Sequence, residues 1–251
     1  MTKSFVIDCL PESPARYENG YAVVAVDVIR ATTVAITAVD RGRRCYPVDS
    51  LDAAIRLAAT LHYPLIAGEV NGNLCPGLEM HNSPSEIDRR SDISRPLILV
   101  SSSGTRLIAN AWRCETVYLA CFRNSLSMGC RLIGEKHERI ALLGAGTKGE
   151  FRQEDQICCA WIAALLARAG YVAEDENTLN ILNRWGHAKA SDCMVSSSVD
   201  YLRRTGQLAD LYFILEHVDD IDDTFVVRNR EVLKITPDMR LNPQTACMAS
   251  E

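Results

Sequence analysis

Short apolar runs alternate with segments of helical spacing along most of this chain. The clearest runs are 21–26, 96–100 and 139–143, and each is followed by a segment in which apolar residues recur every three or four places. Strands that alternate with helices form largely parallel sheets with helices on both faces. The sequence therefore predicts the α/β class, as a three-layer α/β/α arrangement around a largely parallel or mixed sheet.

The length of the chain limits how it can be divided. Its 251 residues suffice for one large α/β domain or for two small lobes. We expect residues 1–236 to form one domain, with two α/β lobes as the alternative, and residues 237–251 to be a flexible tail. The apolar run near the amino terminus is too short for a signal peptide, and no run reaches membrane-spanning length. We therefore expect a cytoplasmic protein without a membrane partner.

Charge and cysteine content narrow the classes of partner. A net charge of -5 and a pI near 5.6 offer no surface for a polyanion, so we expect no nucleic-acid partner. The ten cysteines are scattered and include no Cys-x-x-Cys pair, which favours reduced thiols. Cys158 and Cys159 fall in an apolar helical segment and are expected to pack as small hydrophobes.

Polar residues follow the apolar run 21–26 directly. Asp27, Arg30, Thr32 and Thr33 stand where this strand ends and the next helix begins, and packing alone gives no reason for them there. A carboxylate in this position can hold a divalent cation or act as a nucleophile, and the sequence leaves both roles open for Asp27. The arginine and the two threonines can bind an anion at the amino end of the helix.

The same arrangement recurs in later strand–helix units. Glu69, the segment 101–105 and Asn124 each follow a predicted strand, and Asp155 begins a predicted helix. In a parallel sheet these strand ends lie on one edge, so the separate polar groups are expected to form one site. Each also has a purely structural interpretation: the serines can form a solvated turn, Ser83 can simply cap a helix, and Asp155 can be a first-turn acid.

The last third of the chain changes in character. The spacing predicts helices over 176–185 and 191–205, and either a helix or a strand over 208–217. The acidic residues 219–223 are expected to form a solvated loop, and 225–235 a terminal hairpin.

Taken in order, several short motifs resemble one known family. They are Asp27-Val-Ile-Arg-Ala-Thr-Thr33, Gly68-Glu69, Asn82-Ser83-Pro84, Ser103-Gly104-Thr105, Asn124, and Ala145-Gly146 through Glu154-Asp155. Their succession resembles the 2-phosphosulfolactate phosphatase family, often called the ComB family. The similarity runs from about Ala22 into the carboxyl-terminal third.

The resemblance implies an α/β fold and magnesium-dependent hydrolysis of 2-phosphosulfolactate to sulfolactate and phosphate, on the route to coenzyme M. It implies that Asp27, Arg30, Glu69 and Asp155 are catalytic residues. The three carboxylates among them are the candidate Mg²⁺ ligands, since this ion prefers oxygen. The expected substrate-binding and phosphate-binding residues are Thr32, Thr33, His81, Asn82, Ser83, Ser102, Ser103, Gly104, Thr105 and Asn124.

Two positions depart from the family pattern. Ser103 stands where the family usually has an asparagine, and His81 where it usually has a glycine. We expect these two residues to shift substrate specificity and to leave the reaction class unchanged. The alternative is that His81 points to solvent and Ser103 only shapes its turn.

Other functions remain open at this level. A phosphatase acting on an unrelated phosphoester and a catalytically silent anion-binding protein both fit the motifs. Three acids near the ligand favour a metal site over a pure anion binder. The expected partner is a small anionic phosphoester, and the sequence does not distinguish a monomer from a homodimer.

Overall fold

The computed structural model describes residues 2–146 and 149–236, and the predicted tail 237–251 lies outside this part. The strands are Ser4–Cys9 (β1), Ala22–Val26 (β2), Cys45–Val48 (β3), Leu65–Gly68 (β4), Leu97–Val100 (β5), Thr116–Ala120 (β6), Arg139–Gly144 (β7), Val172–Ala173 (β8), Thr224–Arg228 (β9) and Glu231–Ile235 (β10). The α-helices are Ala31–Asp40 (α1), Leu51–Ala58 (α2), Pro84–Arg89 (α3), Gly104–Asn110 (α4), Ser125–Gly134 (α5), Gln153–Arg168 (α6), Glu176–Trp185 (α7), Ser197–Arg204 (α8) and Leu208–Glu216 (α9). Four 3-10 helices are Ser13–Arg16 (η1), Ala111–Arg113 (η2), Phe122–Asn124 (η3) and Ala190–Val195 (η4).

One mixed sheet runs through the described chain, in the order β4-β5-β3-β10-β9-β6-β2-β7-β1-β8. The helices α6 and α7 pack on β1 and β7, whereas α4 packs on β2 and β3. The predicted three-layer α/β/α class is confirmed. All five residues of β2 are buried, as expected for a strand covered on both faces.

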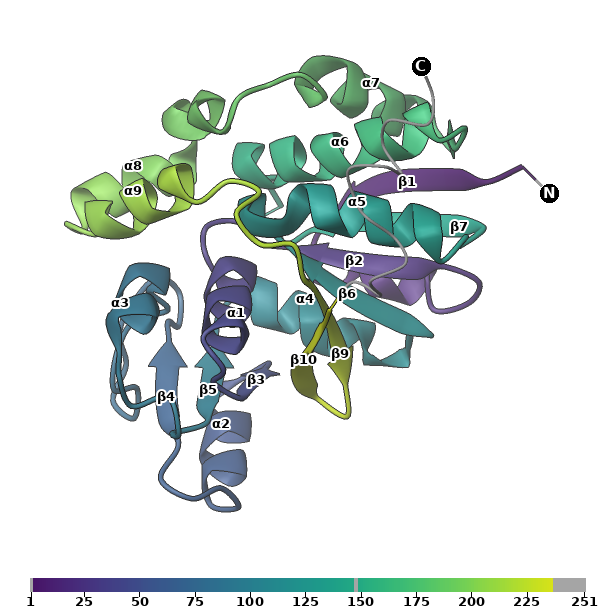
Figure 1. Cartoon of the computed structure of the whole chain (residues 1–251). Coiled ribbons are helices and arrows are strands. Elements are labelled where there is room, and N and C mark those ends of the chain that lie inside the picture. The colour runs from purple at the N-terminus through teal and green to yellow at the C-terminus, as the bar shows by residue number, and fades with distance from the viewer. Residues whose placement is uncertain (1, 147–148, 237–251) are drawn as a thin grey trace.

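The terminal hairpin β9–β10 lies in the middle of the sheet, between β6 and β3 (Figure 1). Each of its strands pairs antiparallel with its outer neighbour, and the two strands are antiparallel to each other. The strands β3, β4 and β5 therefore run opposite to β1, β2, β6, β7 and β8. The expectation of one shared parallel edge for all the polar strand ends is wrong, because the hairpin reverses the direction of one half of the sheet.

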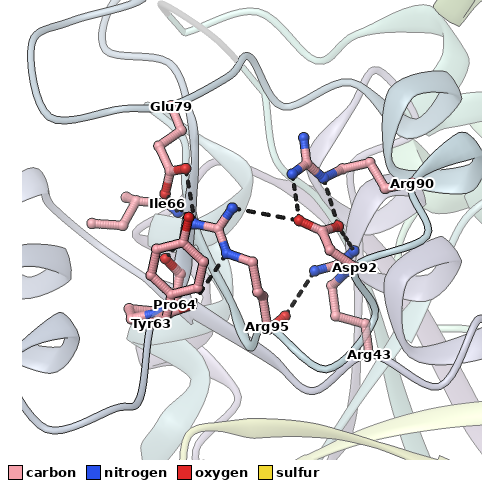
Figure 2. Close-up of polar contacts among 8 residues, drawn as sticks. All are labelled: Arg43, Tyr63, Pro64, Ile66, Glu79, Arg90, Asp92 and Arg95. Atoms are coloured by element: carbon pink, nitrogen blue, oxygen red, sulfur yellow. Dashed lines mark hydrogen bonds and ion pairs between the residues drawn. The ribbon is translucent and has the colours of Figure 1, made fainter.

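Asp92 centres a network of ion pairs before β3 and β5 (Figure 2). It accepts hydrogen bonds from Arg43 at 2.8 Å and from Arg90 at 2.5 Å, and Arg95 lies 3.4 Å away. The hydrogen bonds from Arg90 contribute most to holding the pKa of the Asp92 carboxyl below its usual range. Arg95 also donates to the carbonyl of Pro64, just before β4. The network thus ties together the amino ends of β3, β4 and β5.

Most local predictions agree with the structure. Ser83 caps α3 as its sequence context predicts, Ser50 caps α2, and 208–217 contains a helix. The single helix predicted over 191–205 is wrong: η4 and α8 are separate, because Ser196 adopts an extended conformation and caps α8. Cys158 and Cys159 are buried free thiols in α6, as predicted.

The acidic loop 219–223 is only partly solvated. Asp220 forms an ion pair with Arg123 at 2.7 Å, and Asp219 accepts a hydrogen bond from the main chain at the start of α5. Within residues 2–146 and 149–236, no helix has both the length and the apolar character needed to cross a membrane.

Candidate active site

Segments from both halves of the sheet line a cleft of about 560 Å³. Its walls come from the segments that follow β1, β2, β4, β5 and β7, and from α8. The predicted site residues that line it are Asp27, Arg30, Glu69, Asn82, Ser102, Ser103 and Asp155. Although the two halves of the sheet run in opposite directions, strand ends from both contribute to this one cavity.

Asp27 and Asp155 line the cleft as neighbouring buried acids, 7% and 2% exposed. Burial, together with the charges of Glu154 and Glu69, raises the pKa of Asp27 to about 7, while the N–H of Ala31 favours the charged form and opposes the rise. Burial also raises the pKa of Asp155 well above its usual value, and the charges of Asp27 and Glu154 add to that rise. A cation beside this pair of acids would stabilise their charged forms.

The position of Asp155 follows from the start of α6. Its Oδ1 accepts a hydrogen bond of 2.9 Å from the main-chain N–H of Val28, in the turn after β2. This bond crosses between two chain segments that are distant in sequence. It holds the two aspartates beside each other.

Glu154 is completely buried beside this pair, and neither of its oxygens has a hydrogen-bond partner among the described residues. Burial raises the pKa of its carboxyl, while the nearby hydroxyls of Ser198 and Ser196 oppose the rise. Its place at the start of a helix suggested only a first-turn acid. The signal that could have singled it out was its position within the motif that ends at Asp155.

Glu69 also lines the cleft, and both of its oxygens accept hydrogen bonds. Oε1 accepts from the N–H of Ser102 at 2.6 Å, and Oε2 from the N–H of Gly72 at 2.5 Å and the hydroxyl of Ser102 at 2.9 Å. The Ser102 hydroxyl also accepts from the N–H of Asn71 at 2.7 Å. In this conformation Glu69 joins the segments that follow β4 and β5.

The turn after β5 approaches the acids closely. Gly104, which begins α4, leaves no room for a side chain on the side that faces Asp27. Thr105 does not line the cleft, and its hydroxyl instead accepts from the N–H of Ser101 at 2.7 Å. Thr105 therefore shapes the turn that carries Ser102 and Ser103.

Three other predicted residues support the main chain and lie off the cleft wall. The hydroxyl of Thr32 accepts from the N–H of Asp27 at 2.9 Å, and that of Thr33 donates to the carbonyl of Val28 at 2.8 Å. Asn124 bonds to the main chain of the turn after β6 at 3.0 and 3.2 Å. Their contacts fix the strand-to-helix turns, which is a different role from contacting a ligand.

Within the predicted segment 81–83, one residue lines the cleft and two do not. Asn82 lines the cleft and is 4% exposed, and its Oδ1 has no hydrogen-bond partner among the described residues. His81 is not on the cleft wall, and its Nδ1 is buried without a described partner. The hydroxyl of Ser83 caps α3 and donates to Asp210.

Arg30 reaches the cleft from a buried position. Its Nη1 donates to Asp210 at 2.7 Å and to Gln207, while the residue also lines the cavity. The side chains of Arg30 and Asp210 are each 3% exposed, so this ion pair is almost free of solvent. The sequence gives no reason to single out Asp210, because an acid in the first turn of a helix is common.

The α8 side of the cleft was also missed. Ser197, Ser198, Tyr201 and Arg204 line it from α8, and the hydroxyl of Tyr201 donates to the carbonyl of Gly72 on the opposite wall. Their spacing in sequence is that of an ordinary amphipathic helix, so no local signal marked them.

The chemistry of the donors tests whether Mg²⁺ fits. Among the described residues, no group of three or more His, Cys, Asp or Glu side chains is arranged to hold one metal ion. Mg²⁺ is commonly bound by one or two carboxylates with waters and substrate phosphate oxygens completing its shell. Asp27 and Asp155 fit that pattern, with one oxygen of Asp155 accepting from the N–H of Val28, whereas both oxygens of Glu69 are engaged by N–H and O–H groups.

Comparison with known proteins identifies the family of this chain. A family model described as 2-phosphosulpholactate phosphatase matches residues 8–228. A protein of Symbiobacterium thermophilum named probable 2-phosphosulfolactate phosphatase is 30% identical over 80% of this chain and 88% of its own length. Proteins with the same name are 26% identical in Synechococcus sp. strain WH7803, over 78% of this chain and 82% of theirs, and 28% identical in Deinococcus radiodurans, over 76% and 79%. This chain therefore belongs to the 2-phosphosulpholactate phosphatase family.

Proposed function

We propose that this chain hydrolyses 2-phosphosulfolactate, or a related small 2-phosphorylated acid, to the 2-hydroxy acid and phosphate. Membership in the family supports the reaction class. The observation that carries the proposal is the pairing of Asp27 and Asp155 on the wall of a cleft that Arg30 also lines. A phosphate monoester needs both an arginine for its charge and a group that directs the attacking oxygen.

Arg30 and Asp27 have different roles in the reaction. Arg30 neutralises charge on the phosphoryl oxygens and orients the ester. Asp27, in its ionised form, either orients the attacking water or attacks phosphorus itself. The ester P–O bond breaks, a new P–O bond forms to the incoming oxygen, and a proton ends on the oxygen of the 2-hydroxy acid. Both roles of Asp27 remain alternatives, as they do from sequence.

We propose Mg²⁺ as the cofactor, held by Asp27 and Asp155. When bound, the ion supplies a positive charge for the phosphoryl oxygens and lowers the pKa of a bound water. Burial of two adjacent acids supports this assignment, because burial raises the pKa of both, the charge of Asp27 raises that of Asp155 further, and a cation would oppose these shifts. As the family resemblance implies, we assign the reaction to the route to coenzyme M, and we keep the cytoplasm as its expected location.

The test is phosphate release by the purified chain. We expect release from 2-phosphosulfolactate in the presence of Mg²⁺ and none in excess chelator, with activity restored when Mg²⁺ is added back. A panel of other 2-phospho acids and unrelated phosphoesters, assayed in parallel, identifies the substrate class. Binding of phosphate without turnover of any panel member would identify a catalytically silent anion-binding protein and refute the proposal.

A further inference from the structure

We propose that Asp210 of α9 is a positioning residue for the anion-binding part of the cleft. It orients the guanidinium of Arg30 and fixes the segment that carries Asn82. This inference rests on the proposed function and names the residue that arranges its anion site.

Asp210 is 2% exposed and accepts hydrogen bonds from two distant segments. Its Oδ2 accepts from Nη1 of Arg30 at 2.7 Å. Its Oδ1 accepts from the hydroxyls of Ser83 at 2.5 Å and Ser85 at 2.7 Å, at the start of α3. One carboxylate therefore joins the turn after β2 to α3, which packs against α9.

The contacts of Arg30 leave a defined part of its guanidinium unused. Nη1 donates to Asp210 and to Gln207, and these two acceptors account for both of its hydrogens. Within the described residues, Nε and Nη2 donate to no protein group. These two nitrogens form the side-on edge that binds an oxyanion through two parallel hydrogen bonds. Because Asp210 and Gln207 hold Nη1, they leave this edge to a ligand.

Asn82 precedes Ser83 directly, so the same carboxylate fixes its place on the cleft wall. Its side chain is buried, and its Oδ1 has no partner among the described residues. A buried polar atom of this kind is normally satisfied by a ligand or a water. The unused edge of Arg30 thus lies on a residue that Asp210 binds, and the unpaired amide oxygen of Asn82 lies on the residue directly before Ser83, which Asp210 also binds.

Because the ion pair between Asp210 and Arg30 is buried, the orientation of Arg30 depends on the negative charge of Asp210. Removing one partner of a desolvated ion pair leaves the other charge unpaired and free to seek another contact. Without the carboxylate, Arg30 loses the acceptor that sets its orientation. An asparagine in place of Asp210 would keep the shape of the side chain and accept from Ser83, but it would present no negative charge to Nη1.

The experiment measures binding of inorganic phosphate by calorimetry, together with KM and kcat, for Asp210→Asn, Arg30→Met and the double variant. We expect Asp210→Asn to weaken phosphate binding and raise KM by about tenfold, with a smaller change in kcat. In the Arg30→Met background the same substitution should change phosphate binding less than about twofold, because the group it orients is gone. Asp210→Glu should recover part of the affinity.

Glu216→Gln is the matched control, since it makes the same chemical change on the same helix at an exposed position. Wild-type phosphate affinity in folded Asp210→Asn would overturn the inference, as would an equal loss in both Arg30 backgrounds. If Asp210→Asn does not fold, Gln207→Leu takes its place. Its effect on phosphate binding is then compared between the wild-type and Arg30→Met backgrounds in the same way. Coupled loss of phosphate binding in a chain that hydrolyses no phosphoester would support the positioning role and refute the proposed function alone.

Discussion

Gly104 lies directly against the carboxylate of Asp27. A Cβ built on Gly104 would lie 2.0 Å from Oδ2 of Asp27 and 2.7 Å from the Cβ of Ala31. Real carbon atoms do not approach this closely, so any side chain at residue 104 forces Asp27 or the start of α4 to move. The absence of a side chain at this point is part of the shape of the site.

We therefore expect Gly104→Ala to reduce kcat/KM by about 100-fold or more, since small displacements of reacting groups have effects of this size. Circular dichroism and thermal unfolding should show that the fold remains. The matched control is Gly134→Ala, the same substitution at an exposed helical glycine at the end of α5. A folded Gly104→Ala protein with wild-type kinetics would show that Asp27 tolerates displacement and is not central to the reaction.

The assignment of the metal ligands predicts different results for two acids. Asp155→Asn should raise the Mg²⁺ concentration for half-maximal activity by more than about tenfold, because it removes a proposed ligand. Glu69→Gln should change that concentration little, and should lower the free energy of unfolding by about 1–2 kcal/mol by disturbing hydrogen bonds to Ser102 and Gly72. Titration of activity with Mg²⁺ and urea unfolding measure the two effects. If Glu69→Gln has the larger effect on the Mg²⁺ requirement, then Glu69 rearranges to bind the ion.

The buried acids predict how stability depends on pH without a divalent cation. The pKa of Asp27 is about 7 in the folded chain and 3.8 as its ordinary value, so between these values the folded state holds a proton that the unfolded state has released. Stability is therefore greatest below the ordinary value and falls as pH rises through about 7. Urea unfolding in chelator from pH 5 to 8 should show this fall, and Asp27→Asn should make it shallower. Stability that rises over this range would contradict the burial of these acids.

Stabilisation by Mg²⁺ should change with pH in the opposite direction. Carboxylates bind the ion only after losing their protons, so the increase in melting temperature on adding Mg²⁺ should grow from pH 5.5 to 8. Ca²⁺ serves as a comparison for general ionic effects. An increase that is independent of pH would place the stabilising ion away from Asp27 and Asp155.

Ser103 and His81, the two departures from the family pattern, are expected to differ in their effect on substrate specificity. Ser103 lines the cleft and His81 does not. Ser103→Asn should change the ratio of kcat/KM between 2-phosphosulfolactate and other 2-phospho acids by about tenfold, the scale of one altered pocket contact. His81→Gly alone should leave the ratio unchanged. Identical substrate rankings for the wild type and the variant that combines Ser103→Asn with His81→Gly would show that neither residue sets specificity.

Elements set by local sequence were predictable. The apolar run of β2, the serine caps of α2 and α3, and the hairpin β9–β10 all follow from spacing and turn chemistry. The insertion of that hairpin into the sheet was not predictable, because pairing between distant strands depends on the whole fold. The reversed direction of β3, β4 and β5 follows from this pairing.

In the candidate site, too, some residues could be predicted from local sequence and others could not. Asp27 and Asp155 could be identified because acids at strand-to-helix junctions need an explanation beyond packing. Thr32 and Thr105 stand at equivalent junctions but bond to the main chain, and a hydroxyl that shapes a turn has the same sequence pattern as one that binds a ligand. Asp210 gave no signal, since its partners are distant in sequence.

The place of β9–β10 in the sheet has a consequence for synthesis of the chain. Among the strands of residues 2–146 and 149–236, these two leave the ribosome after all the others, yet they lie between β3 and β6, which are made much earlier. Until residues 224–235 emerge, β6 exposes an unpaired edge at Tyr118 and Leu119, and β3 exposes one at Cys45. Nascent chains shorter than this must keep two open strand edges from pairing with each other or with other chains.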